Sequence, residues 1–384
     1  MRILILLSNG IKHDHRVGKE IESLLSAGHQ IVLLDFPAVS EVVSRDDGAY
    51  KIHSVRLWTR QLPRNLLFWP LKYLEMNLRF FLMGKKIKPD IVHCVDRLPL
   101  IAAYLIAKNL HVKYIYDSKE IHAGLETDAN KPKWFWLWME RFLSQRAARV
   151  LVTDHFRLDI TARILQLEKS RLFVLMNLPK IPPPSLSERN LRADSPWPDG
   201  KIAVYAGAIS PNRHLEDIIT ALTFLPENYN IAIIGVGDEG YKNLLRSLAR
   251  NLGIQKRLAI LPPVGWAELP YYIGTADCAL AFYQKNSLNN LYCSPSKLFD
   301  ALMAGLPVIS GDNPLVLEVL QQNDAGICLN SITGETIAQS LQELLSRDDL
   351  KDMKKRLANI AKTQYSWETQ EESFLGLYKE VLCQ

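Results

Sequence analysis

Cysteine is scarce in this sequence of 384 residues and never occurs at the spacing of a metal-binding or redox pair. The five cysteines are scattered, and no two of them form a CxxC motif. An odd number of dispersed cysteines argues against a disulfide framework and against a structural zinc site. Reduced thiols are typical of the cytoplasm, so we expect a cytoplasmic protein.

Long apolar runs are also absent from the sequence. The run ILILL, at residues 3–7, ends at Ser8-Asn9-Gly10 and is too short for the apolar part of a secretory signal. No uninterrupted stretch reaches the length of a membrane span. We therefore expect a protein that is neither secreted nor integral to a membrane.

Positive charge is unevenly distributed along the chain. The net charge is +5, and residues 60–88 hold seven basic residues against the single acid Glu75. Bulky apolar residues lie between these charges, which is the composition of a helix that rests on an anionic membrane surface. The same composition fits a packing helix with a solvated basic face. Peripheral membrane contact is thus one of two interpretations, and no nucleic-acid partner is expected.

The distribution of apolar residues predicts an α/β protein with two domains. Short apolar runs alternate with helical periodicity in both halves of the chain, as expected for parallel sheets with crossover helices. Residues 178–200 contain six prolines and mostly polar residues, which is typical of a linker. We predict Rossmann-like domains at residues 1–182 and 201–365, joined by a Pro-rich linker at 183–200.

One segment of the second domain, YCSPSKLFDALMAGLPVIS at residues 292–310, combines a helix start with two charges. Ser294 is a favourable N-cap, Pro295 suits the first helical position, and Gly305 follows the helix. Lys297 and Asp300 share one helix face because they are three positions apart. A helix start with a lysine favours a phosphate, and a nearby carboxylate can bind ribose hydroxyls. The alternative is an ordinary surface salt bridge.

Several motifs occur together in the order found in one enzyme family. They are SPSKLFDALMAGLPVIS, YAGAISPNRHLEDIITAL, IIGVGDEGYKNLLRSLARNLGI, YIYDSKEIH and the closing YSWETQ. With them the chain resembles the retaining GT-B glycosyltransferases of family 4. The resemblance implies two facing Rossmann-like domains, with the donor nucleotide-diphosphate sugar bound mainly by the second domain. It also implies metal-independent transfer and a last helix, residues 366–384, that returns to the first domain.

The resemblance assigns roles to residues of the donor site. Asp300 would hold the ribose hydroxyls, Lys297 would meet the diphosphate, and Arg213 would neutralise the leaving diphosphate. Further nucleotide-sugar-binding positions are the helix-start residues Ser296 and Leu298, the glycines Gly10, Gly207 and Gly235, and Tyr292.

The chain also departs from the family pattern. Tyr292 replaces the first glutamate of the family's E-x7-E motif, and Ala208 replaces a basic phosphate-binding residue whose role Lys297 can take. Lys119 stands where the family commonly has a catalytic histidine, so Asp117 or His122 would share its task. The weaker acceptor-side candidates are Asp14 and Arg16, which can equally form a helix cap and its dipole partner. The histidines show no metal-ligand spacing, and His93 is interpreted as a core residue.

These observations predict a hexosyltransferase that moves a sugar from a UDP-sugar, with UDP-glucose as the first candidate, to a glycan or lipid-linked acceptor in polysaccharide biosynthesis. Neither a metal nor a cofactor is expected. Two alternatives stay open. One is a nucleotide-sugar epimerase of the same fold, and the other is a non-catalytic subunit that binds sugar nucleotides.

Overall fold

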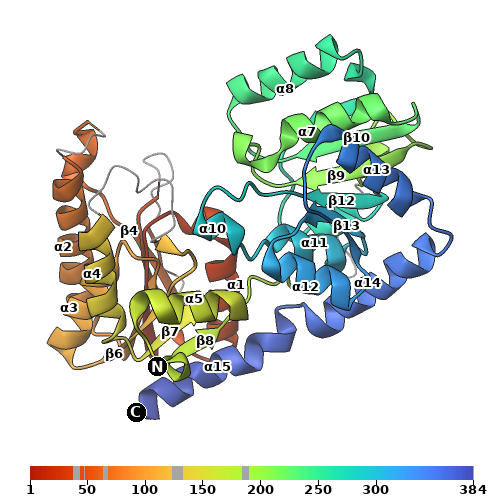
Figure 1. Cartoon of the computed structure of the whole chain (residues 1–384). Coiled ribbons are helices and arrows are strands. Elements are labelled where there is room, and N and C mark those ends of the chain that lie inside the picture. Colours follow the sequence, from red (N-terminus) through yellow and green to blue (C-terminus); the bar gives the residue numbers. More distant parts are fainter. Residues whose placement is uncertain (38–43, 47, 64–67, 123–132, 184–189, 384) are drawn as a thin grey trace. The chain divides into compact units, whose positions relative to one another are not determined.

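Figure 1 shows a computed structural model of the chain, which forms two compact units. The structure describes residues 1–37, 44–46, 48–63, 68–122, 133–183 and 190–383. The first unit consists of Met1–Met176 and Gln370–Gln384, and the second of Asn177–Thr369. Residues 64–67 of the basic segment and 184–189 of the predicted linker lie outside the described residues.

The first unit is built on a sheet whose central strands are apolar on both faces. Its described strands follow the order β3-β4-β2-β1-β5-β6-β7-β8, and only β3 is antiparallel to its neighbour. Strands buried on both faces are typical of parallel sheets covered by helices. Their bounds are β1 Arg2–Leu7, β2 Gln30–Asp35, β3 Ser44–Asp46, β4 Tyr50–Ser54, β5 Ile91–Val95, β6 Lys113–Asp117, β7 Arg149–Val152 and β8 Leu172–Val174.

Helices pack against this first sheet. The helices α2, α3 and α4 lie beside one another in Figure 1. The last helix, α15, contributes Phe374 and Tyr378 to the interior of the same unit. The bounds are α1 His15–Ser26, α2 Trp69–Ile87, α3 Leu100–Leu110, α4 Lys133–Ser144, α5 His155–Leu165 and α15 Glu368–Cys383, with short 3-10 helices η1 Ile11–His13, η3 Trp58–Gln61 and η6 Lys169–Arg171.

The second unit repeats the same plan with a fully parallel sheet. Its described strands follow the order β11-β10-β9-β12-β13-β14, the doubly wound order in which ligands bind at the carboxyl ends of the strands. The strands are β9 Lys201–Ala206, β10 Tyr229–Ile234, β11 Leu258–Leu261, β12 Cys278–Ala281, β13 Val308–Gly311 and β14 Gly326–Leu329. The two α/β units therefore confirm the predicted fold class.

The helices of the second unit include one inside the predicted linker. Helix α6, Leu191–Asp194, has Leu191 fully buried, and Arg192 donates to the carbonyl of Gly200 at 2.7 Å. The part of the predicted linker that contains α6 is therefore packed within the second unit. The other helices are α7 Leu215–Ala221, α8 Glu239–Asn251, α9 Leu269–Ile273, α10 Leu288–Leu291, α11 Ser296–Met303, α12 Pro314–Gln322, α13 Gly334–Leu345 and α14 Leu350–Gln364, with 3-10 helices η7 Pro211–Arg213, η8 Leu222–Phe224 and η9 Gln255–Arg257.

The predicted start of α11 is wrong by one residue. Pro295, not Ser294, occupies the N-cap position, and Ser296 is the first helical residue. The predicted end is confirmed because Gly305 follows the C-cap with φ of 71°, and its N–H donates to the carbonyl of Leu302 at 2.9 Å.

Membrane-spanning helices were also sought in the structure. Among the described residues, none of the helices combines the length and the apolar character needed to cross a bilayer.

The close approach of β13 and β14 makes one glycine decisive for stability. Gly326 has φ of 148°, and a Cβ atom there would lie 1.8 Å from the carbonyl oxygen of Val308. We expect Gly326→Ala to lower the free energy of unfolding by about 2–4 kcal/mol, because the strands must separate and the backbone is strained. Urea unfolding measures this change.

The matched control is Gly376→Ala in α15, where a Cβ meets no atom within 4 Å. Alanine is favoured over glycine within a helix, so this variant should be unchanged or more stable by up to about 1 kcal/mol. Equal stability of the two variants would contradict the prediction.

Candidate active site

Two cations meet over one aromatic ring at the carboxyl edge of the second sheet. The guanidinium carbon of Arg213, at the end of η7, lies 4.3 Å from the centroid of the Tyr283 ring. The Lys297 ammonium, from the first turn of α11, lies 4.9 Å from the same centroid and donates to the Tyr283 hydroxyl at 3.3 Å. The structure therefore brings together the two basic residues that the sequence assigned to a diphosphate.

These two cations are only weakly compensated by carboxylates, because among the described residues Asp300 acts on Lys297 less strongly than Arg213 does. Nε and Nη1 of Arg213 are buried and have no hydrogen-bond partner among the described residues. Removal from water, and then repulsion by Arg213, lower the pKa of Lys297 to about 7, although Asp300 opposes this shift. Buried charges normally have partners, so this part of the unit is electrostatically incomplete without an anion.

Two glycines make room for the lysine. Gly207, after β9, has φ of 151°, and a Cβ there would lie 2.0 Å from Cε of Lys297. Gly235, after β10, has φ of 156°, and a Cβ there would lie 1.8 Å from the carbonyl oxygen of Gly207. Both positions require glycine because the backbone and the lysine chain pack directly against it.

The arginine is held in place by the loop after β12. The backbone N–H of Gln284 donates to the carbonyl of Asn212 at 3.2 Å, and its side-chain amide donates to the carbonyl of Pro211 at 3.3 Å. Because Tyr283 precedes Gln284, the ring under Arg213 and the anchor of η7 belong to one loop. Sequence analysis did not identify Tyr283 or Gln284, since their role depends on pairing between β9 and β12.

The other predicted donor-site residues lie around the same helix start. Asp300 is on α11, one turn after Lys297, and is half-buried. Ser296 is the first residue of that helix, whereas the Leu298 N–H already donates to the Pro295 carbonyl at 3.2 Å. Tyr292 is the C-cap of α10. Ser296 and Lys297 are thus better placed than Leu298 to offer backbone N–H groups to an anion.

A second polar cluster lies within the first unit, at the carboxyl edge of its own sheet. Arg16, which is buried, donates to Asp117 at 2.8 Å and to Glu20 at 3.0 Å. Burial, followed by repulsion from Asp117, raises the pKa of Glu20 to about 8, so that carboxyl group is largely protonated at neutral pH. One guanidinium therefore holds two carboxyl groups together in a site that water cannot reach.

His93 is fully buried, which confirms its interpretation as a core histidine, and it also belongs to this cluster. Its Nδ1 lies 2.5 Å from the hydroxyl of Tyr378 on α15, and its Nε2 lies 3.8 Å from Glu20. Burial and then Arg16 lower the pKa of His93 to about 3, which keeps the imidazole neutral. Sequence spacing could not reveal these contacts because the partners are far apart in the chain.

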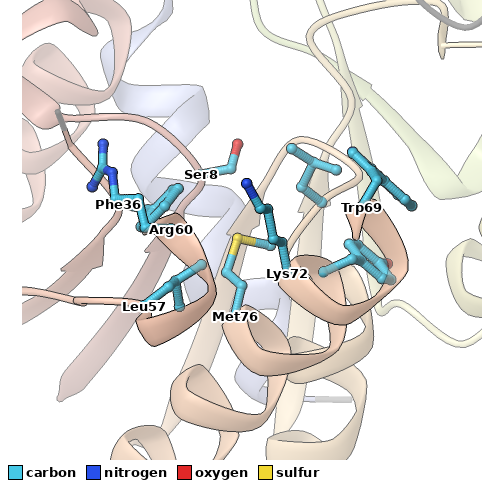
Figure 2. A pocket seen from close by; sticks show the side chains of 9 residues that line it. Ser8, Phe36, Leu57, Arg60, Trp69, Lys72 and Met76 are labelled. Carbon is cyan, nitrogen blue, oxygen red and sulfur yellow. The ribbon is translucent and has the colours of Figure 1, made fainter. Parts of the chain in front are cut away.

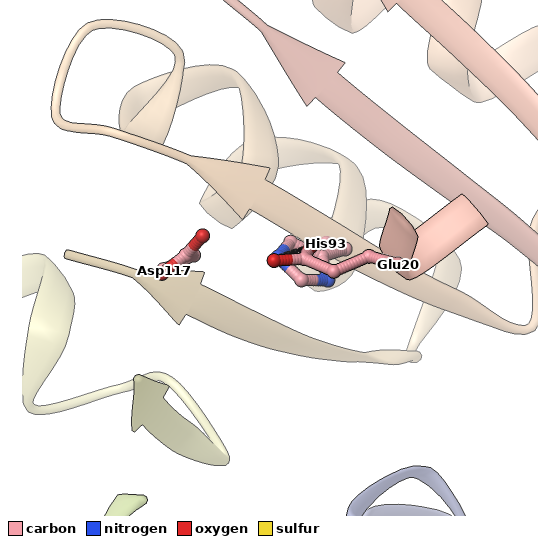
Figure 3. A group of neighbouring side chains, drawn as sticks. All are labelled: Glu20, His93 and Asp117. Atoms are coloured by element: carbon pink, nitrogen blue, oxygen red, sulfur yellow. Dashed lines mark ion pairs between the residues drawn. The ribbon is translucent and has the colours of Figure 1, made fainter. Parts of the chain in front are cut away.

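Figure 3 shows Glu20, His93 and Asp117, whose ligand atoms lie within 4.8 Å of one another. This spacing would accommodate a metal ion. However, the Arg16 guanidinium donates to both carboxyl groups and already supplies the positive charge that a metal would bring. We therefore interpret the cluster as an ion-pair network.

Lys119 lies at the edge of this network and is tied to Asp14 at 2.5 Å. Asp14 also caps α1 by accepting from the Val17 N–H at 3.1 Å, so its capping role is confirmed. Burial opposes the charge of Lys119, but Asp14 and then Asp96 hold its pKa above the ordinary value. The lysine is therefore a cation at neutral pH and cannot act as a proton acceptor there.

The remaining candidates of the first unit lie nearby. His122 is buried, with Nε2 3.9 Å from Asp96, and burial raises the pKa of Asp96 to about 7. Asp96 has φ of 64°, an uncommon conformation for an aspartate. Gly10 is buried with φ of −77°, which any residue can adopt, so glycine is not required there by its backbone angle.

Comparison with known families accounts for most of the chain. The family described as "Glycosyl transferase 4-like domain" matches residues 14–177, and "Glycosyl transferases group 1" matches residues 187–364. The chain belongs to the GT-B glycosyltransferases of family 4 type. A GDP-mannose-dependent alpha-(1-6)-phosphatidylinositol monomannoside mannosyltransferase of Mycobacterium tuberculosis is 25% identical over 162 residues, which are 41% of this chain and 42% of that protein. The match thus spans less than half of this relative.

Solved structures share the whole fold of this glycosyltransferase. Anabaena HepE in complex with UDP aligns over 99% of this chain and 100% of its own, with TM-score 0.76 and 13% identity. The sucrose-phosphate synthase of Thermosynechococcus elongatus aligns over 100% of both chains, with TM-score 0.78 and 14% identity. These likenesses establish the fold.

The lowered pKa of Lys297 predicts proton uptake when a diphosphate binds. An anion beside the ammonium raises its pKa above about 7, so at pH 8 the bound protein holds a proton that the free protein has lost. UDP affinity should therefore fall as pH rises above about 7, by at most tenfold per pH unit. Calorimetry at pH 8 in buffers of different ionisation enthalpy measures the uptake.

Lys297→Gln is the control, because it removes the titrating group and leaves the carboxyl groups of the first unit unchanged. The proton uptake should disappear in this variant. Uptake of the same size in both proteins would assign it to another group.

Proposed function

We propose that this glycosyltransferase moves a hexose from a UDP-sugar, with UDP-glucose as the first candidate, to a glycan or lipid-linked acceptor, with retention of configuration and without a metal ion. The weakly compensated pair of Arg213 and Lys297 carries the proposal. A diphosphate supplies the negative charge that balances the pair, and no other arrangement of described side chains in the second unit offers two such cations on one ring.

The rest of the donor fits around that anion. Asp300 lies one helical turn beyond Lys297, where its carboxylate can accept both ribose hydroxyls. HepE structures are complexes with UDP and with UDP and glucose, whereas the mycobacterial relative is GDP-mannose-dependent. The first set supports a uridine donor, and a panel of nucleotides that includes GDP tests the base directly.

The reaction is a substitution at the anomeric carbon. The bond from this carbon to the diphosphate oxygen breaks, the acceptor hydroxyl oxygen bonds to the same carbon, and the hydroxyl proton passes to the departing diphosphate. Arg213 and Lys297 stabilise the charge that grows on the diphosphate as the bond breaks, which is the role that a metal has in other enzymes.

The buried network of the first unit would serve the transferred sugar. Lys119 has three N–H donors, and Asp14 accepts one of them, so others remain available for a sugar hydroxyl or phosphate. Arg16 and Asp117 fix the end of β6 that leads to Lys119. In this proposal Lys119 donates a hydrogen bond and takes no proton.

The exposed face of α2 supports peripheral membrane contact. Leu71, Leu74, Leu78 and Leu82 recur at helical spacing and are 49–61% exposed. Lys85 and Lys86 follow at the end of the same helix and are exposed. Exposed leucines flanked by cations match a helix that lies in an anionic membrane surface, and a lipid-linked acceptor would be presented there.

The first test removes the arginine of the donor site. Arg213→Gln should lower kcat by about 100- to 1,000-fold with a smaller change in the donor KM, because its charge matters most in the transition state. The wild-type rate should persist in EDTA, and added manganese should not restore the variant. Release of free UDP from the donor measures turnover even before the acceptor is known.

Arg246→Gln, on α8 of the same unit with a side chain that is 42% exposed, is the matched control and should keep full activity. Dependence on manganese, or full activity of Arg213→Gln, would contradict the mechanism. Formation of an epimeric sugar nucleotide would indicate the epimerase instead, and nucleotide binding without any turnover would indicate a non-catalytic subunit.

The second test concerns the membrane. Lys85→Gln with Lys86→Gln should weaken binding to anionic vesicles by about 30-fold, since each basic residue contributes about 1 kcal/mol at such a surface. Vesicle sedimentation at two salt concentrations measures the loss. The control pair, Lys351→Gln with Lys355→Gln on exposed positions of α14, should bind like the wild type. Equal binding to neutral and anionic vesicles would exclude this surface.

A further inference from the structure

The first unit contains a cavity that the donor chemistry does not use. It has a volume of about 290 Å³ and is lined by nine residues, none of which is acidic. Figure 2 shows several of these side chains, including Arg60, Trp69 and Lys72. Ligand sites span about 300–1,000 Å³, and this cavity lies at the lower end of that range, which suits a ligand no larger than one sugar residue with a small substituent.

Both cations of the cavity are held by neutral groups. Nη1 of Arg60 donates to the carbonyl of Pro37 at 2.8 Å, and Nζ of Lys72 donates to the carbonyl of Leu62 at 2.6 Å. Among the described residues, no carboxylate forms an ion pair with either of them. Each retains further N–H donors, because a guanidinium has five and an ammonium three.

Two acids of the described residues on neighbouring elements, Asp35 and Glu75, have other partners. Asp35, at the end of β2, accepts from the Ser54 hydroxyl at 2.6 Å and from the Ile11 N–H at 3.2 Å. Glu75, on α2, accepts from Arg79 at 2.7 Å and from two backbone N–H groups of η3. The positive charge of the cavity is therefore left for a ligand.

Aromatic rings form the rest of the wall. The guanidinium of Arg60 lies 4.7 Å from the Phe36 centroid, which fixes its plane. Trp69 stacks on Tyr73 at 5.3 Å and meets Trp136 edge-on at 4.8 Å, so its ring is fixed from two sides. Rigid rings with polar edges suit the apolar faces of a sugar ring, and the two cations suit a negative substituent on it.

The cavity lies at the same edge of the sheet as Lys119. Ser8 and Phe36 line it directly after β1 and β2, and Leu98 lines it shortly after β5. Asp117 ends β6, which pairs with β5. Neighbouring parallel strands present their carboxyl ends along one edge, so a ligand in the cavity lies along the edge that carries the polar network.

We propose that this cavity binds the acceptor through a saccharide that carries a phosphate or carboxylate group, with Arg60 and Lys72 on the anion and Trp69 against the sugar. The inference rests on the proposed function, because it assigns the acceptor side of glycosyl transfer. The proposed site would select acidic acceptors over neutral ones.

The experiment titrates four probes into the full chain saturated with UDP, so that phosphate cannot occupy the donor site. The probes are glucose 1-phosphate, glucuronate, glucose and inorganic phosphate. Glucose 1-phosphate or glucuronate should bind at least tenfold more tightly than glucose and inorganic phosphate, and their relative affinities distinguish a phosphate-bearing from a carboxylate-bearing acceptor. Lys72→Gln and Arg60→Gln should each weaken that binding by about 10- to 100-fold.

Lys72→Arg keeps the charge and should retain most of the affinity, whereas Lys113→Gln lies at the exposed start of β6 and should change nothing. Thermal unfolding of each variant checks that the chain remains folded. Equal binding of glucose and its acidic forms, or undiminished binding by Lys72→Gln, would overturn the inference. Normal UDP binding alongside such a result leaves the proposed function standing, while saccharide binding without UDP binding would overturn only the proposed function.

Discussion

Two positive charges meet on one aromatic ring in the second unit, and their mutual repulsion constrains what this part of the unit can bind. Arg213 and Lys297 reach Tyr283 from different elements, and the repulsion between them is a cost that the folded protein bears without a ligand. The surrounding backbone is built for this arrangement, because Gly207 leaves the space that the lysine chain fills. A bound diphosphate would reduce this repulsion. The same two charges that destabilise the folded unit would therefore favour the binding of an anion.

The first unit has the opposite charge imbalance, because the buried carboxyl groups around Arg16 outnumber the cation that pairs with them. Arg16 joins Asp117 to Glu20, and the rise in the Glu20 pKa removes one negative charge at neutral pH. His93 stays neutral and links the network to Tyr378 of the last helix. The C-terminal helix therefore contributes a hydroxyl to the interior beneath the candidate site, as well as its apolar packing.

The structure shows what surrounds two of the residues that depart from the family pattern. Lys119 in place of the usual histidine is matched by Asp14, which holds it as a cation. Lys297 lies directly on Gly207, next to the position where Ala208 replaces a basic residue. Lys297 on α11 therefore brings a positive charge close to that position, beside Arg213 of η7, and its role in place of the basic residue stays a prediction. The role of Tyr292 on the sugar side stays a prediction.

The sequence by itself predicted the alternation of strands and helices and the helix that carries Lys297 and Asp300, whereas anion binding at the start of α11 stays a prediction. Apolar runs and helical periodicity depend on local spacing, so β1 and β2 and the Lys297–Asp300 face could be predicted without a fold. Tertiary structure alone decided the rest. Short β4 has only one buried residue, Ile52, so its sequence carries a weak strand signal. The cluster of Arg16, Asp117 and Tyr378 joins residues up to hundreds of positions apart. Such contacts follow from the order of strands in the sheet and from where α15 packs, and no local pattern carries that information.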